Sequence, residues 1–303
     1  MRESPLLAWA IVPGFATLLL SSPYSRGESP RSQANVESTP SSRWFSLTGD
    51  YSQEPSSDRE RTPAATTESK DSWEIDGPVF LRSADPEPYG EGVIKNFFTW
   101  ETTKGSDDDD DFEYEFVFEY GFAPNHEFIL EVPFDIGDGH VEGNGDIEQL
   151  GWHWRLWEET DSLPAFAMRN IIRVPTGVDS SGVDYLWRGL FTKTLIPDKM
   201  RLHLNPFVKS VNGDNQEDAR HFQWGTAIGT DYRLADNLNF IADYIYSNGE
   251  EEHTRDNHRA EFGLDWEFAD HQMFSVATQI GLDGDSHGPA LGVSIAYIFS
   301  FGG

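Results

Sequence analysis

Between Gly92 and Phe301 the chain repeats one pattern: an alternating apolar and polar segment, a short turn, a second such segment and a long acidic loop. The short turns are alike, each placing small or polar residues between apolar ones, at Phe122–Asn125, Ile196–Lys199, Leu234–Asn237 and Phe268–His271. The intervening loops are longer and polar, as at Lys104–Asp111 and Asn248–Asn257. Strands of about ten residues, with short turns at one end and long loops at the other, are typical of bacterial outer-membrane β-barrels.

Residues within each segment alternate with a period of two. Phe116 and Phe118 point to one side of an extended chain, whereas Glu115 and Glu119 point to the other. Alternation over whole strands requires one apolar and one polar face. We therefore predict an all-β fold, an antiparallel up-and-down transmembrane β-barrel of about twelve strands. The strands are expected near residues 92–102, 112–122, 127–135, 149–156, 165–174, 185–196, 200–211, 222–233, 238–247, 258–268, 273–282 and 289–301.

The first 75 residues divide into two segments of different composition. Arg2 precedes an apolar stretch, Leu6–Leu20, which is shorter than the roughly 20 residues of a spanning helix and suits a signal peptide. We expect a signal peptide over residues 1–27, with an uncleaved membrane anchor as the alternative. Residues 28–75 are rich in Ser and Pro and contain few aliphatic residues, which predicts disorder. The barrel domain is expected over 76–303, beginning with an irregular segment, Asp76–Gly92.

The composition limits the partners of the chain. A formal net charge of −30 excludes a general nucleic-acid binder, because there is no basic surface to neutralise phosphates. The chain has no cysteine, which fits export to an oxidising compartment. We expect localisation in the outer membrane of a Gram-negative cell, with membrane lipids as partners and a small solute of unknown identity.

Acidic residues collect in the long loops. Clusters of carboxylates bind divalent cations or bridge lipid head groups through them, but they also form solvated, mutually repulsive surfaces. No cluster has the spacing of a dedicated calcium loop, and the sequence leaves both interpretations open. The clusters are Asp107–Asp111, Glu142 with Asp146, Asp214 with Glu217 and Asp218, Glu250–Glu252, and Asp283 with Asp285.

The sequence offers no motif for catalysis. The nine histidines show no metal-binding spacing, and no G-x-S-x-G context places a nucleophilic serine. We therefore predict no catalytic residue, no bound metal and no cofactor.

Charged residues are expected on the polar, inward face of the strands. They can pair across the lumen as structural salt bridges, or set a field that selects ions in a pore, and the two roles are compatible. The candidate pore-lining residues are Arg155, Arg169, Arg173, Arg201, Arg233, Arg259, Glu113, Glu115, Glu119, Glu127, Glu131 and Asp265.

Two short motifs resemble those of a known family. Glu142-Gly-Asn-Gly-Asp146 precedes one expected strand, and Arg173-Val-Pro-Thr-Gly177 ends the next. This pairing resembles the outer-membrane β-barrel transporter family associated with meta-pathway phenol degradation, over roughly Pro86–Phe301. The resemblance implies a channel-type barrel for small aromatic or other hydrophobic compounds. The chain departs from the usual barrel terminus, because Gly302 and Gly303 follow Phe301.

The expected function is that of an outer-membrane channel or uptake protein for passive passage of small molecules. A barrel of about twelve strands lies between small barrels filled by side chains and wide porins, so any pore should be narrow. Two alternatives remain open: an outer-membrane barrel enzyme of the lipase or protease type, and a non-conducting structural or adhesive barrel.

Overall fold

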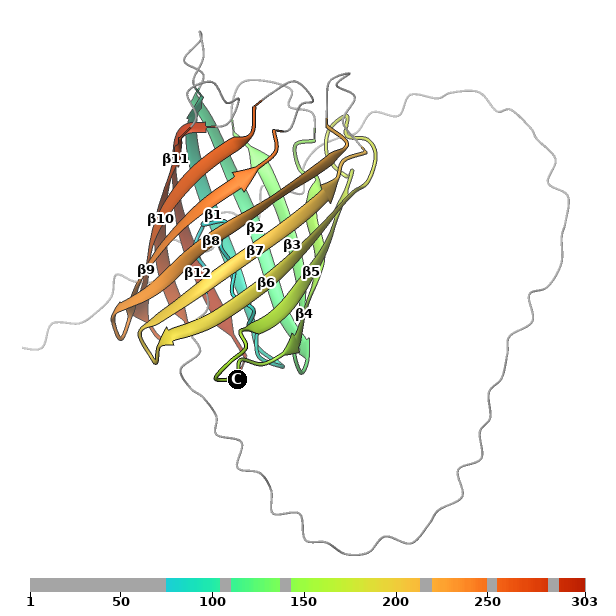
Figure 1. The fold of residues 1–303 in the computed structure, drawn as a ribbon. Coiled ribbons are helices and arrows are strands. Elements are labelled where there is room, and N and C mark those ends of the chain that lie inside the picture. Colours follow the sequence, from blue (N-terminus) through green and yellow to red (C-terminus); the bar gives the residue numbers. More distant parts are fainter. Residues whose placement is uncertain are drawn as a thin grey trace, which may run out of the picture. The chain divides into compact units, whose positions relative to one another are not determined.

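The structure, a computed structural model, describes residues 75–103, 110–136, 143–212, 220–249, 255–282 and 289–302, which form a closed antiparallel β-barrel of twelve strands (Figure 1). The predicted fold class is confirmed. The strands are β1 (Gly92–Thr103), β2 (Asp110–Ala123), β3 (His126–Asp135), β4 (Ile147–Trp157), β5 (Ala165–Val174), β6 (Asp184–Ile196), β7 (Met200–Ser210), β8 (Phe222–Ala235), β9 (Leu238–Ser247), β10 (Asn257–Ala269), β11 (Gln272–Gly281) and β12 (Pro289–Phe301).

Each strand pairs with its neighbours in sequence, and β1 closes the barrel against β12. The predicted short turns connect β2 to β3, β6 to β7, β8 to β9 and β10 to β11. Asn125, Asp198 and His271 adopt positive φ angles in these turns, at 64°, 56° and 63°. Asn, Asp and His tolerate this left-handed region better than other non-glycine residues, which explains their recurrence there. We call this end of the barrel the turn side and the other end the loop side.

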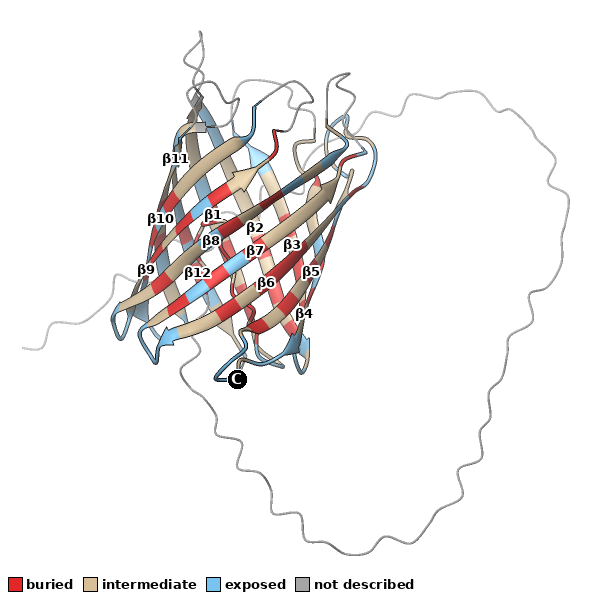
Figure 2. Cartoon of the chain, viewed as in Figure 1, coloured by how far each residue is buried: buried red, intermediate tan, exposed pale blue. Residues whose placement is uncertain are grey.

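The two faces of the wall differ as the alternation predicts. In β7, the side chains of Leu202 and Leu204 are exposed on the outside, whereas His203 and Asn205 are fully buried inside. In β4, Trp152 is exposed and His153 is buried. Figure 2 shows the resulting alternation of burial along the strands. Because a slip of one residue would exchange the two faces, this pattern confirms the expected register.

The residues before the first strand lie inside the barrel. We call residues 75–91 the inner segment; it precedes β1 in Figure 1. Its apolar residues Ile75, Val79 and Leu81 are buried and pack against inward-facing residues of the wall, among them Ile241 and Ile245 of β9. The sequence predicted the irregular conformation of this segment and missed its position in the lumen.

The expected signal peptide over residues 1–27 lies outside the described residues, as does the predicted disordered segment up to residue 74. Among the described residues, no helix has the length and apolar character needed to cross a membrane.

The chain terminus explains one departure noted in the sequence. Gly302 has a φ angle of 95°, and a Cβ atom there would collide with the backbone of Gly90 and Glu91. Only glycine combines that backbone conformation with such a close approach. Gly302 therefore lets the end of β12 pack against the end of the inner segment.

Candidate functional site: the barrel lumen

The inner segment is held to the wall by its backbone amides. A backbone N–H that is buried away from water needs a hydrogen-bond acceptor. The inner segment is irregular and is not paired as a strand, so strand pairing does not supply the acceptors. Side chains of the wall accept instead, and their order follows the wall from β10 towards β3. The pairs are Phe80 N to Glu261 Oε2 (2.6 Å), Leu81 N to Asp243 Oδ2 (3.1 Å), Arg82 N to Asn205 Oδ1 (2.8 Å), Ala84 N to Thr192 Oγ1 (2.8 Å) and Glu87 N to Glu127 Oε2 (2.9 Å).

Asp85 of the inner segment joins two strands of the wall. Its carboxylate lies 2.9 Å from Arg155 Nη1 on β4 and 3.3 Å from Arg201 Nη1 on β7. Arg201 also pairs with the fully buried Asp231 of β8. The segment is thus tied to the wall by charges as well as by amides.

A cluster of three carboxylates, those of Asp76, Glu87 and Glu119, has the dimensions of a metal site. Lys95 of β1, which is 2% exposed, places its Nζ 2.6 Å from both Asp76 Oδ1 and Glu119 Oε2. The ammonium group therefore supplies the positive charge that the carboxylates need. The cluster is an ion-pair network that holds the inner segment near β1 and β2.

The inner segment leaves the lumen against Gly121 of β2. Gly90 N donates to Gly121 O at 2.8 Å, and Gly121 N donates to Glu91 O at 2.9 Å. A Cβ atom at Gly121 would collide with the carbonyl oxygens of Glu87 and Pro88. A glycine is required here because the two backbones approach so closely.

Arg169 of β5 extends past β4 to pair with two carboxylates on the same side of the wall. Its Nη2 lies 3.0 Å from Glu119 Oε1 on β2 and 3.2 Å from Glu127 Oε1 on β3. All three side chains are buried. This pairing has the geometry of the structural salt bridge that the sequence left open as one role for the inward charges.

The two motifs that carry the family resemblance meet at the loop side. Arg173 Nη1 lies 2.6 Å from Asp146 Oδ2, and Asp146 Oδ1 accepts from the backbone N–H groups of Thr176 and Gly177 at 2.9 and 2.7 Å. A Cβ atom at Gly177 would collide with the backbone of the first motif, including the Asp146 amide. Arg173 Nε also lies 2.8 Å from Asp184 Oδ2 at the start of β6. The motifs therefore form one latch between two loops.

Asp146 lies outside the strands and is the acceptor at the centre of this latch. Burial alone would raise its pKa, but hydrogen bonds from the Ser180 hydroxyl, the Gly177 amide and Arg173 outweigh burial and hold the pKa of the carboxyl below its usual value of 3.8. The Ser180 hydroxyl donates at 2.6 Å. The latch therefore contains an ionised Asp146 at neutral pH.

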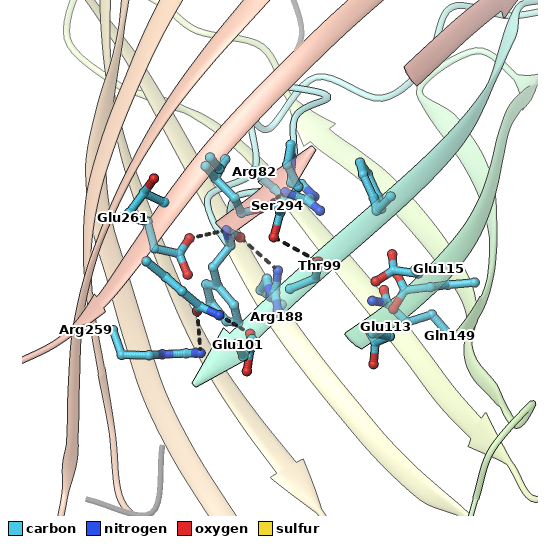
Figure 3. A pocket seen from close by; sticks show the side chains of 18 residues that line it. Arg82, Thr99, Glu101, Glu113, Glu115, Gln149, Arg188, Arg259, Glu261 and Ser294 are labelled. Carbon is cyan, nitrogen blue, oxygen red and sulfur yellow. Dashed lines mark hydrogen bonds between the residues drawn. The ribbon is translucent and has the colours of Figure 1, made fainter. Parts of the chain in front are cut away.

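A cavity of about 260 Å³ opens on the loop side of the inner segment. Charged side chains dominate its lining (Figure 3), and Phe80 and Phe97 also line it. Glu101 and Arg259 stand close to the loop ends of β1 and β10, which places the cavity towards that rim. The charged lining residues are Glu101, Glu113, Glu115, Glu131, Glu261, Arg82, Arg188 and Arg259.

The remaining sequence-predicted residues are not brought into one site. Arg259 donates to Gln279 Oε1 at 3.2 Å within the cavity. Asp265 is buried on the opposite, turn-side half and accepts from the Ser275 hydroxyl. Arg233 is half-buried near the turn end of β8. Most of the acidic loop clusters lie outside the described residues; Asp146 is described, and so is the backbone of Asp110 and Asp111.

Sequence reasoning missed two buried cations of the wall. Lys95 and Arg188 are 2% and 7% exposed and face inwards, but each is the only cation on the inward face of its strand between apolar neighbours. The signal that could have located them is the period of two, which assigns Lys95 to the inward face between Val93 and Phe97, and Arg188 to the inward face between Leu186 and Leu190.

The fold has counterparts among solved structures. It is similar to the COG4313 outer membrane channel from Pseudomonas putida F1, at 12% sequence identity and a TM-score of 0.53, covering 72% of this chain and 98% of that channel. It is also similar to the NanC porin, at 9% identity and a TM-score of 0.50, covering 69% of this chain and 98% of that porin. No protein-family model and no curated relative matches the chain. The chain has the fold of an outer-membrane β-barrel, shared with channels and porins.

Proposed function

We propose that this protein is an outer-membrane channel for the passive passage of small molecules, narrowed by the inner segment. The observation that carries the proposal is the division of the lumen into an open, charged cavity on the loop side and a tethered segment across the turn side. The tethers are hydrogen bonds and ion pairs, such as Ala84 to Thr192 and Asp85 to Arg155. These polar contacts can be exchanged for water when the segment moves, unlike the apolar packing of its residues Ile75, Val79 and Leu81.

The lining of the cavity favours a polar solute. Five carboxylates and three guanidinium groups line it. An aromatic or hydrophobic compound, as the family resemblance implies, would have to desolvate these groups without pairing them, which is costly. We therefore propose small polar or charged molecules as the solutes.

A non-conducting barrel is the second candidate, because the buried inner segment favours it directly. Residues such as Leu81 and Ala84 are fully buried inside the lumen. A segment that never moves would leave a scaffold whose acidic loops act at the surface. The two candidates can be distinguished by conductance: a channel formed by the intact chain conducts ions, and a non-conducting scaffold does not.

Single-channel recording of the full chain in planar bilayers tests the proposal. We expect small, discrete conductance steps with a preference for cations at low salt, which fades with ionic strength because exposed acidic loops are screened first. Liposome swelling with small sugars and with glycine is the parallel measurement. Silent bilayers and unswollen liposomes would favour the scaffold, and hydrolysis of ester or peptide substrates by the same preparation would favour an enzyme.

A further inference from the structure

Arg188 of β6 is a buried cation without an ion pair. It is 7% exposed, and no carboxylate of the described residues lies within ion-pair distance of it. Its guanidinium lies 4.0 Å above the centre of the Phe80 ring, Nη1 donates to Phe80 O at 3.3 Å, and Nε has no partner. Buried charges are normally paired, so an unpaired guanidinium on a cavity wall is a site for an anionic group.

A second cation on the neighbouring strand β5 adds to the positive charge around Arg188. Arg169 stands directly opposite it across the β5–β6 ladder. Like charges opposite each other destabilise a sheet, and the carboxylates that compensate here, Glu119 and Glu127, pair with Arg169 and not with Arg188. A carboxylate brought by a ligand would compensate Arg188.

The wall of the cavity formed by β2 and β3 carries unpaired carboxylates instead of an unpaired cation. Glu113 and Glu115 have no ion-pair partner among the described residues. The charged groups that act on Glu113 are all carboxylates, those of Asp135, Glu101 and Glu148. Glu131 on β3 is 9% exposed and lines the same cavity. This wall is complementary to a cationic group.

The two unpaired groups are separated across the cavity. Figure 3 shows Glu113 and Glu115 together on one side, apart from Arg188. The buried Phe97 and the half-buried Phe80 also line the cavity, and they offer an apolar surface for a short carbon chain. With five carboxylates and three guanidinium groups, the lining carries two carboxylates in excess.

We propose that this cavity binds a small zwitterion with an additional cationic group, the chemistry of a basic amino acid. The carboxylate of the ligand pairs with Arg188, its cationic groups lie among Glu113, Glu115 and Glu131, and its methylene chain passes the phenylalanine rings. The inference deepens the proposed function, on which it rests, because it names the solute class that enters the channel from the loop side.

Calorimetry on the full chain in detergent micelles tests this with three probes of similar length. L-lysine carries all the charges, cadaverine lacks the carboxylate, and L-norleucine lacks the side-chain ammonium. Lysine should bind most tightly, with a Kd lower than that of either other probe by about tenfold or more, the scale of one charge-assisted hydrogen bond. The Glu113→Gln/Glu115→Gln double variant should raise the Kd of lysine and of cadaverine together.

The Arg188→Met variant separates a binding role from a structural one. It should raise the Kd of lysine about tenfold and leave that of cadaverine within about twofold, because cadaverine has no carboxylate. Arg188→Lys should retain most of the lysine affinity, and Asp198→Asn, in an exposed turn, should change neither. Equal affinities for the three probes, or equal losses for lysine and cadaverine in Arg188→Met, would overturn the inference.

Conductance measured on the same preparations keeps the two proposals apart. Conductance without lysine binding would overturn the binding site and leave the channel in place. Lysine binding in a silent barrel would overturn the channel and support the site as a receptor for the same class of molecule.

Discussion

The two halves of the lumen differ in how their charged side chains are neutralised. On the turn side, Arg201 and Lys95 pair with carboxylates of both the wall and the inner segment. On the loop side, Arg188 and Glu113 face the same cavity without an ion pair among the described residues. The same types of residue therefore form ion pairs in one half and line the cavity unpaired in the other.

Inward-facing charged side chains are therefore not by themselves evidence of a pore. The turn-side pairs are buried or half-buried and connect elements far apart in sequence, as Asp85 connects to Arg155 and Arg201. Breaking a buried pair leaves an uncompensated charge, whereas altering an unpaired charge does not. Substitutions in the two halves should have different consequences, and this makes the comparison testable.

The largest expected effect on stability comes from Arg169. The Arg169→Met substitution would leave Glu119 and Glu127 buried with one cation fewer, and we expect a loss of about 3–5 kcal/mol in the free energy of unfolding. Urea unfolding of the barrel in lipid vesicles, followed by tryptophan fluorescence, measures this. Glu115→Gln is the control on the loop side and should change stability by less than about 0.5 kcal/mol. Similar losses from the two substitutions would break the comparison.

A smaller effect is expected from Asp146 in the loop-side latch. Its pKa is lowered in the folded state, so its contribution to stability is complete above the unfolded value of 3.8 and is lost as pH falls through the lower folded value. Unfolding in lipid vesicles at a series of pH values from about 6 down to about 2–3 should show this loss. Asp146→Asn should flatten the curve in that window.

The matched control for the latch is Asp198→Asn, because Asp198 is exposed in a turn and asparagine also tolerates its positive φ angle. It should leave the acid limb of the stability curve unchanged. An unchanged acid limb in Asp146→Asn as well would mean that the latch does not stabilise the loop rim.

The wall of the barrel could be predicted from sequence because its strands and turns depend on residues that are close together in the chain. A period of two assigns each residue of a strand to a face, and Leu204 and Asn205 lie where that period puts them. The turns could also be predicted, because residues such as Asn125 tolerate the positive φ angle that these turns require. Lys193 fits on the outward face of β6 because its ammonium reaches the near rim and pairs with Glu159 at 2.7 Å.

The contents of the lumen could not be predicted, because they depend on contacts between distant residues. The inner segment contains Pro78, Pro86 and Pro88 and has no period, so its sequence shows only that it is irregular. Its place is set by acceptors such as Thr192 and Asp243, which are 108 and 162 residues away from their donors. Sequence reasoning likewise grouped all inward charges as one set, since spacing does not reveal which of them find partners.

The central claim is that the inner segment, rather than the wall, limits passage through the barrel. Deleting residues 76–88 and recording single channels beside the intact chain tests it most directly, with the gel mobility of unheated samples as the check that both barrels are folded. We expect a several-fold larger conductance for the shortened chain, because the turn-side half of the lumen would then be open. Equal conductance in two folded barrels would mean that the wall, and not the inner segment, limits passage.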